Sequence, residues 1–89
     1  MYGYFVKIVS DPPKRLRNLE ERGLDFDHLT VEFFEGAAIY PAKGGRYMAI
    51  NMFRGHLHTV IFTRLGREAI SVVSLRRASK KERTRHEKG

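Results

Sequence analysis

The fold is decided by the stretch RYMAINMFRGHLHTVIFT, Arg46 to Thr63. Two runs rich in apolar, β-branched and aromatic residues lie on either side of Arg54-Gly55, and such runs are typical of strands. A glycine-containing dipeptide between them is typical of a tight turn that joins antiparallel strands. We therefore predict a β-hairpin with strands at Arg46–Phe53 and Leu57–Thr63.

Weaker strand signals lie on both sides of this hairpin. Before it, we predict a short strand at Ala37–Ala42 and a turn at Lys43–Gly45. After it, the turn RLGRE leads into a strand at Ala69–Leu75. Near the amino terminus, the alternating run Tyr4–Val9 predicts a first strand. The strands that follow residue 36 are expected to form an antiparallel run.

The segment SDPPKRLRNLEERG predicts a helix. Asp11 is placed to cap it, Pro12 suits its first position, and Gly23 can end it in a left-handed conformation. By helical spacing, we expect Leu16 and Leu19 to face the core. A different face of this helix carries Lys14, Asn18 and Arg22.

The segment GLDFDHLTVEFFEG predicts a second helix, which Asp25 caps and which buries a stripe of Phe26, Leu29 and Phe33. The 89 residues contain no repeat and no linker, so we expect one domain, with residues 79–89 as its carboxy-terminal helix or tail. A strand, two helices, an antiparallel β-meander and a final helix make an α+β fold.

Charge is spread unevenly along the chain. Residues 1–44 hold six Lys or Arg and seven Asp or Glu, a net charge of −1, whereas residues 45–89 hold eleven and three, a net charge of +8. A cationic half of this kind indicates a polyanionic partner, most often nucleic acid. Cysteine is absent, which excludes disulfides and thiolate chemistry and fits a cytoplasmic protein. No apolar stretch approaches the roughly 20 residues of a membrane span.

The positive charge is concentrated in VVSLRRASKKER, Val72 to Arg83. Ser79 and Glu82 have the spacing of a capping box, which predicts a helix start. Lys80 and Lys81 then fall in the first helical turn, where the helix dipole disfavours cations. Residues placed where they destabilise local structure, as these lysines do at a helix start, are more often functional. We therefore interpret this cluster, which follows a strand end, as a phosphate site.

Arg76 and Arg77 extend the cluster into the preceding strand. The guanidinium group pairs bidentately with phosphate and stays charged, which suits such a site. Because side chains alternate along a strand, one arginine of this adjacent pair is expected on each face of the sheet. The strand end and the helix start are therefore both expected to contribute cations.

The histidines are weaker signals. His56 and His58 share one face of a strand, as a metal-binding pair does, but no third ligand accompanies them. We therefore interpret them as surface positions at the hairpin end, and keep His58 as a candidate general acid or base. His28 and His86 are expected on the surfaces of helices.

Aromatic residues leave two interpretations open. Tyr40 and Tyr47 lie beside Lys43 and Arg46, so they are candidates for stacking on nucleic-acid bases. Three of the six phenylalanines, Phe26, Phe33 and Phe62, are more simply explained as core.

Together these motifs resemble the BrnT family, ribonuclease toxins of BrnT–BrnA toxin–antitoxin pairs that are related in fold to RelE toxins. The segments DPPKRLRNLEERGLDF, GRYMAI with FTRLGRE, and ISVVSLRRASKKER carry the resemblance, which covers about residues 6 to 85. The matching positions are Asp11, Lys14, Asn18, Gly23, Phe26, Arg46, Thr63, Arg64, Ser74, Arg76, Ala78, Glu82 and Arg83. The chain departs from the family pattern at Ser10, Arg22 and Ser71.

The resemblance implies a RelE-like fold, cleavage of RNA and arrest of translation. It also implies neutralisation by a BrnA-like ribbon-helix-helix antitoxin, in a 2:2 complex that binds operator DNA through the antitoxin. Because RNA supplies its own nucleophile, the 2′-OH, we expect a reaction without a metal or another cofactor. No residue is a convincing general base.

We expect Arg64 and Arg76 to bind the scissile phosphate and Lys14 to stabilise charge or transfer a proton. The residues expected to bind the rest of the RNA are Arg46, Arg77, Lys80, Lys81 and Arg83. Two other functions remain open on the residues alone. A basic RNA-binding or ribosome-associated module without catalysis would use the same cations, and a metal-dependent nuclease would need a cluster of carboxylates that is not evident.

Overall fold

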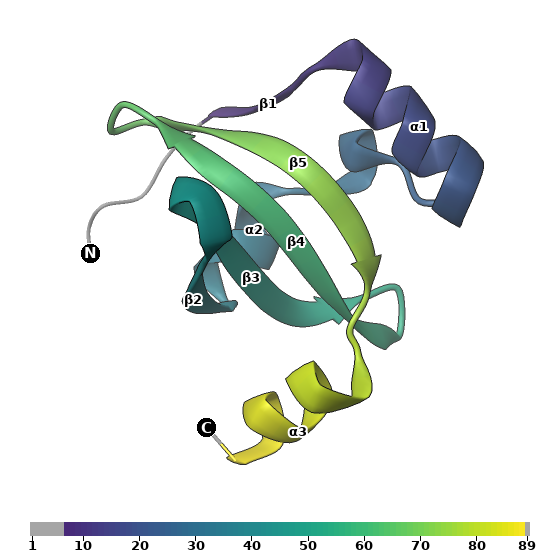
Figure 1. Cartoon of the computed structure of the whole chain (residues 1–89), viewed down its shortest axis with the longest axis vertical. Coiled ribbons are helices and arrows are strands. Elements are labelled where there is room, and N and C mark those ends of the chain that lie inside the picture. Colours follow the sequence, from purple (N-terminus) through teal and green to yellow (C-terminus); the bar gives the residue numbers. More distant parts are fainter. Residues whose placement is uncertain (1–6, 89) are drawn as a thin grey trace.

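A mixed five-stranded sheet is the frame of the computed structural model, which describes residues 7–88 (Figure 1). The strands lie in the order β1-β5-β4-β3-β2. They are β1 Lys7–Ser10, β2 Ala38–Ala42, β3 Arg46–Phe53, β4 His56–Leu65 and β5 Ala69–Arg77. The helices are α1 Pro12–Arg22, α2 Val31–Glu35 and α3 Lys80–Lys88, with short 3₁₀ helices η1 Phe26–His28 and η2 Lys43–Gly45. The α+β class expected from the sequence is confirmed.

The β3–β4 hairpin forms where the sequence predicts it. Arg54 and Gly55 both have positive φ, 54° and 85°. A two-residue turn that matches the twist of its strands requires this conformation at both positions. β3 has its expected bounds, and β5 continues beyond its expected end to Arg77.

β1 makes the sheet mixed instead of antiparallel. It pairs in parallel with β5, with Ile8 opposite Ile70 and Ser10 opposite Val72, whereas the other three pairs of neighbours are antiparallel. The first strand therefore lies beside the last strand of the sheet. Residues 4–6 of the predicted first strand lie outside the described residues. Within residues 7–88, no helix is long and apolar enough to cross a membrane.

The second predicted helix is interrupted. The side chain of Asp25 caps η1 by accepting from the backbone N–H two residues on, at 3.0 Å. Leu29 follows with an extended backbone, φ −76° and ψ 142°, and α2 begins only after it. The expectation of one continuous helix is therefore wrong. The expected apolar stripe is confirmed, since Phe26, Leu29 and Phe33 are all buried.

Helix α1 starts and stops at the expected residues but presents a different face to the core. Asp11 occupies the position before the helix in an extended conformation, but its side chain makes no capping hydrogen bond, so the predicted side-chain cap is wrong. Gly23 ends the helix with a φ of 68°, as expected. The side chains of Leu16 and Leu19 are 52% and 37% exposed, whereas Asn18 is only 5% exposed. The expectation that the two leucines face the core is therefore wrong.

Asn18 explains this orientation. Its side-chain nitrogen donates to the carbonyl oxygens of Leu24 and Leu75, both at 2.9 Å, and its side-chain oxygen accepts from the Leu75 N–H at 3.1 Å. The pairing of β1 with β5 ends at Val72, so the Asn18 amide takes the place of a strand partner for Leu75. Leaving these buried backbone groups unpaired would cost more than exposing two leucines partly.

The sheet has an apolar face and a mixed face. The apolar face packs against η1 and α2. Its core residues are Phe26, Leu29, Phe33, Phe34, Ala49, Val60, Phe62, Ile70, Val72 and Leu75. Side chains one residue along a strand point to the other face, where Thr59 and its cross-strand neighbour Ile50 are fully buried. A register shift between β4 and β5 at Ile61 and Phe62 interrupts this alternation in β5, so Val72 and Leu75 share the apolar face. Helix α3 makes its contacts on this mixed face, well apart from α1 (Figure 1).

Replacement of Asn18 tests whether this amide fixes α1. Asn18→Ala leaves three backbone groups of Leu24 and Leu75 without partners, so we expect the free energy of unfolding to fall by about 3 kcal/mol. Urea denaturation of the purified variant measures this change. Leu16→Ala, on the same helix but exposed, is the control and should cost less than about 0.5 kcal/mol. A larger loss for the leucine variant would contradict the assignment.

Candidate functional site

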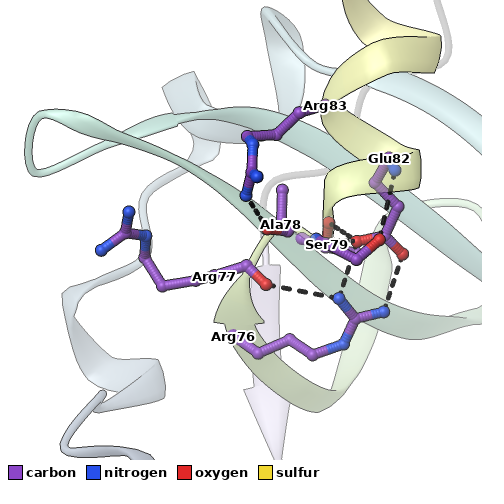
Figure 2. A network of polar contacts seen from close by, with 7 residues as sticks. Arg76, Arg77, Ala78, Ser79, Glu82 and Arg83 are labelled. Carbon is purple, nitrogen blue, oxygen red and sulfur yellow. Dashed lines mark hydrogen bonds and ion pairs between the residues drawn. The ribbon is translucent and has the colours of Figure 1, made fainter.

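A carboxylate with four donors lies at the junction of β5 and α3 (Figure 2). Arg76 donates to Glu82 from Nη1 to Oε1 at 2.7 Å and from Nη2 to Oε2 at 2.8 Å. Oε1 also accepts from the Thr59 hydroxyl and from the Ser79 backbone N–H, each at 2.9 Å. We call these four residues the Glu82 cluster. It ties β4 and β5 to the start of α3.

The predicted capping box is part of this cluster. The Ser79 Oγ accepts from the Glu82 backbone N–H at 3.1 Å, and the Glu82 carboxylate accepts from the Ser79 N–H in return. The capping box is therefore confirmed. The same carboxylate caps the helix and holds Arg76, which the sequence spacing alone did not show.

The cluster fixes the ionisation of its two charged members. The Arg76 guanidinium lowers the pKa of Glu82 from its usual 4.5 to about 2, and the hydrogen bonds from Ser79 and Thr59 add to this effect. The Glu82 carboxylate in turn raises the pKa of Arg76. Both groups are therefore charged at physiological pH. A carboxylate this acidic is a poor proton acceptor, so Glu82 does not qualify as a general base.

Arg76 keeps donors that Glu82 does not use. A guanidinium has five N–H groups in one plane, and the two bonds to Glu82 occupy one on each Nη. A further contact from Nη1 to the Arg77 carbonyl oxygen is long, at 3.4 Å. Nε has no partner within residues 7–88. Because Glu82 fixes the plane of the group, Arg76 is an oriented cation with donors still available.

Other cations surround the Glu82 cluster. Arg77, Lys80 and Lys81 are exposed, and none of them forms an ion pair within the described part of the chain. Arg83 donates to the Ala78 carbonyl oxygen at 2.9 Å (Figure 2). The residues Lys80, Lys81, Thr84, Arg85 and Lys88 of α3 line an open hollow of about 750 Å³. Four of the five predicted RNA-binding residues thus lie near one another.

The three predicted catalytic residues do not come together. Lys14 is exposed on α1, which is remote from α3 (Figure 1). Arg64 lies on β4 five residues beyond Thr59, the cross-strand neighbour of Arg76. Five residues correspond to roughly 17 Å along an antiparallel strand, and an odd spacing places the two side chains on opposite faces. Only Arg76 belongs to the Glu82 cluster.

Arg46 is also separate from the Glu82 cluster. It is the first residue of β3 and is exposed. Its spacing of four from Ile50 places it on the mixed face, because residues an even number apart share a face. This predicted RNA-binding residue therefore lies on the same side of the sheet as Arg76, toward the opposite end of the strands.

The histidines of the hairpin occupy two different environments. His56 is exposed, as expected. His58 is only 2% exposed, and its ring contacts Phe53 edge-on with centroids 5.1 Å apart. Its Nδ1 lies 2.9 Å from the His56 carbonyl oxygen. The expected surface position is therefore wrong for His58. No group of three or more potential metal ligands occurs within residues 7–88.

His86 is the residue that sequence reasoning missed. It was expected on the surface of a helix, but it is half-buried, and its Nδ1 is a buried nitrogen with no hydrogen-bond partner among the described residues. The available signal was its spacing of four from Glu82, since residues four apart share a helical face. Thr59 gave no comparable signal, because its partner Glu82 is distant in sequence.

Both tyrosines that were candidates for stacking on bases contact other side chains. The guanidinium carbon of Arg85 lies 3.9 Å from the centre of the Tyr40 ring. Tyr47 stacks on Phe62, with ring centroids 5.7 Å apart and an interplanar angle of 27°. Phe62 is buried, as expected. Neither tyrosine therefore presents two free faces to a base.

Comparison with known proteins links this geometry to one family. A family model described as the ribonuclease toxin BrnT of type II toxin–antitoxin systems matches residues 11–82. The 1.1 Å crystal structure of the Brucella abortus ribonuclease toxin BrnT is similar, with 47% sequence identity and a TM-score of 0.78. The match covers 84% of this chain and 99% of that one. No curated protein sequence matches the chain.

Acid should weaken the attachment of α3. A carboxylate whose pKa is lowered by folding stabilises the protein fully when the pH is above the pKa of the unfolded state. This stabilisation is lost as the pH falls toward the pKa of the folded state. For Glu82 the range runs from 4.5 down to about 2. We therefore expect the melting temperature to fall across this range, and to fall less in Glu82→Gln. Asp25, whose pKa is also lowered to about 2, titrates in both proteins. Equal pH dependence in both would contradict this contribution of Glu82.

Proposed function

Because the chain belongs to the BrnT family of ribonuclease toxins of type II toxin–antitoxin systems, we propose that it cuts RNA without a metal ion at the junction of β5 and α3. The observation that carries this location is the bidentate contact between Arg76 and Glu82, which orients a cation among unpaired ones. The RNA itself contributes the nucleophile, the 2′-OH next to the scissile phosphate. The protein then has to position the phosphate and stabilise the added negative charge.

Arg76 is proposed to bind the scissile phosphate through the donors that Glu82 leaves available. An oriented guanidinium stabilises developing charge without having to reorganise during the reaction. Glu82 is then a positioning residue, since it acts through Arg76. The positive charge at the site comes from side chains, and the reaction as proposed has no step that uses a metal.

The neighbouring cations are proposed to bind the RNA backbone on either side of this phosphate. Their exposure and lack of ion pairs within residues 7–88 leave them available to a polyanion. These backbone-binding residues are Arg77, Lys80, Lys81 and Arg83. Arg46 can extend the contact along the mixed face, whereas Lys14 and Arg64 are assigned to outlying RNA contacts because of their distance from Arg76.

The family implies a protein antitoxin as partner and RNA as substrate. We propose that the antitoxin is a BrnA-like ribbon-helix-helix protein, in a 2:2 complex that binds operator DNA through the antitoxin. The cationic surface of α3 suits acidic residues of such a partner. We further propose that the protein acts in the cytoplasm, that it arrests translation, and that its fold is related to that of RelE toxins.

Paired substitutions distinguish the phosphate-binding arginine from a backbone-binding lysine. Arg76→Gln combined with Glu82→Gln removes the cation without leaving a buried carboxylate unpaired. We expect cleavage of RNA in EDTA to fall about 100- to 1,000-fold while RNA binding persists. Lys80→Ala should keep the parent cleavage rate. Its affinity for RNA should depend on salt less steeply than that of the parent, by the amount that corresponds to about one lost phosphate contact.

Melting temperatures measured beside these rates separate catalysis from folding. A folded double variant that cuts RNA at the parent rate would remove Arg76 from the site. If the parent protein binds RNA in EDTA but leaves it intact, the metal-independent mechanism is wrong, and a binding module or a metal-dependent reaction takes its place.

Charge reversal on α3 tests the proposed antitoxin surface. Lys81→Glu should weaken binding of the antitoxin, and the loss should shrink at high salt because it is electrostatic. Lys43→Glu, an exposed lysine in η2 at the other end of β3, is the matched control and should bind like the parent. Titration calorimetry measures both affinities. Equal affinity of all three proteins would place the antitoxin elsewhere.

A further inference from the structure

His86 has a buried nitrogen that the interactions of the fold leave unused. Its Nδ1 is inaccessible to solvent and has no hydrogen-bond partner among residues 7–88. Buried polar groups in folded proteins almost always have partners, because an unpaired one destabilises the structure. An exception of this kind is therefore a reason to look for a function. Since the residue as a whole is only half-buried, part of it remains in contact with solvent.

The geometry of α3 places His86 over the mixed face of the sheet. Near its start, α3 is joined to β4 and β5 through the contacts of Glu82 with Thr59 and Arg76. One turn later, Arg85 covers the ring of Tyr40 on β2. The helix therefore crosses the sheet from β5 toward β2.

Glu82 and His86 are the two half-buried positions of α3, while every other residue of the helix is exposed. Positions four apart lie on the same helical face, with a rise of about 6 Å between them. The imidazole therefore faces the sheet about one turn beyond the carboxylate that holds Arg76. It belongs to the same region as the proposed phosphate site.

The ionisable groups that face this region already have partners, with one exception. On α3 itself Glu82 bonds Arg76 of β5, and Arg85 contacts Tyr40 of β2. β4 contributes no ionisable residue to this face, since its residues there are Leu57, Thr59, Ile61, Thr63 and Leu65. The exception is Arg46, at the far end of β3. His86 is thus the histidine beside the Glu82 cluster, and its Nδ1 makes no hydrogen bond within residues 7–88.

The other histidines do not meet this requirement. His58 lies on the opposite face of the sheet, and its Nδ1 contacts the His56 carbonyl oxygen. A carbonyl oxygen only accepts, so this contact fixes the proton on Nδ1. His28 contacts Arg54 through its Nδ1 at 2.8 Å and lies in η1, on the core side of the sheet.

We infer that His86 is the general base of the ribonuclease reaction, an inference that rests on the proposed function and completes it. Because Nδ1 is inaccessible, Nε2 of the neutral imidazole takes the proton of the 2′-OH and afterwards releases it to solvent. The 2′ oxygen forms a bond to phosphorus, the bond from phosphorus to the 5′ oxygen breaks, and that oxygen takes a proton from water. The products are a 2′,3′-cyclic phosphate and a 5′-hydroxyl. Imidazole suits this step because it titrates near physiological pH.

His86→Gln tests the inference, since glutamine keeps helix propensity and cannot act as a base at neutral pH. The parent rate of RNA cleavage in EDTA should rise with pH between about 5.5 and 7.5. The variant should cut about 100- to 10,000-fold more slowly, lose this pH dependence and bind RNA like the parent. His56→Gln, an exposed histidine outside the region, is the matched control and should keep both the rate and its pH dependence.

The outcomes separate this inference from the proposed function. If the parent cuts RNA in EDTA and a folded His86→Gln protein cuts equally fast, His86 is not the base, while the proposed function stands. If the parent does not cut RNA, the proposed function itself fails. Should the variant not fold, the parent profile decides, because a cleavage rate that does not rise with pH in this range overturns the assignment.

Discussion

The attachment of α3 to the sheet depends on one carboxylate. Glu82 accepts from a guanidinium, a hydroxyl and a backbone N–H that come from β5, β4 and the residue before α3. Helix α3 has nine residues and none of them is buried, so it has no apolar face to dock and is too short to be stable alone. Its place over the mixed face therefore rests on polar contacts, to which Arg85 and Arg83 add. The proposed site exists only while these contacts hold.

The two faces of the sheet differ, since one carries the packed core and the other carries the proposed site. The face under η1 and α2 carries the packed aromatic core, including edge-to-face contacts of Phe34 with Phe33 and Phe62. The other face carries Arg76 and Thr59 beside α3. Because neighbouring residues of a strand alternate between faces, β4 and β5 serve both purposes with one run of sequence.

Local signals in the sequence were reliable, and long-range ones were not. The Arg54-Gly55 turn and the capping box of Ser79 and Glu82 are decided by residues within a few positions, and both were predicted. The orientation of α1 depends on Asn18 and Leu75, which are 57 residues apart, so the hydrophobic spacing of Leu16 and Leu19 was misleading. The same limit applies to the candidate site. Arg76, Arg77 and the lysines of α3 were predicted together because they are contiguous, whereas Thr59 and His86 lie beside them only through strand register and the path of α3.

The parallel pairing of β1 with β5 has a consequence for the order in which the protein can form during synthesis. A ribosome releases β1 first, yet its neighbour in the sheet is the last strand to be made, and the partner of Asn18 is in that strand too. The hairpin of β3 and β4 can close early, because its contacts are local. The edge of the sheet, and α3 with its cations, must wait until β5 and α3 have left the exit tunnel. The proposed cutting site, which needs β5 and α3, therefore assembles later than the central hairpin.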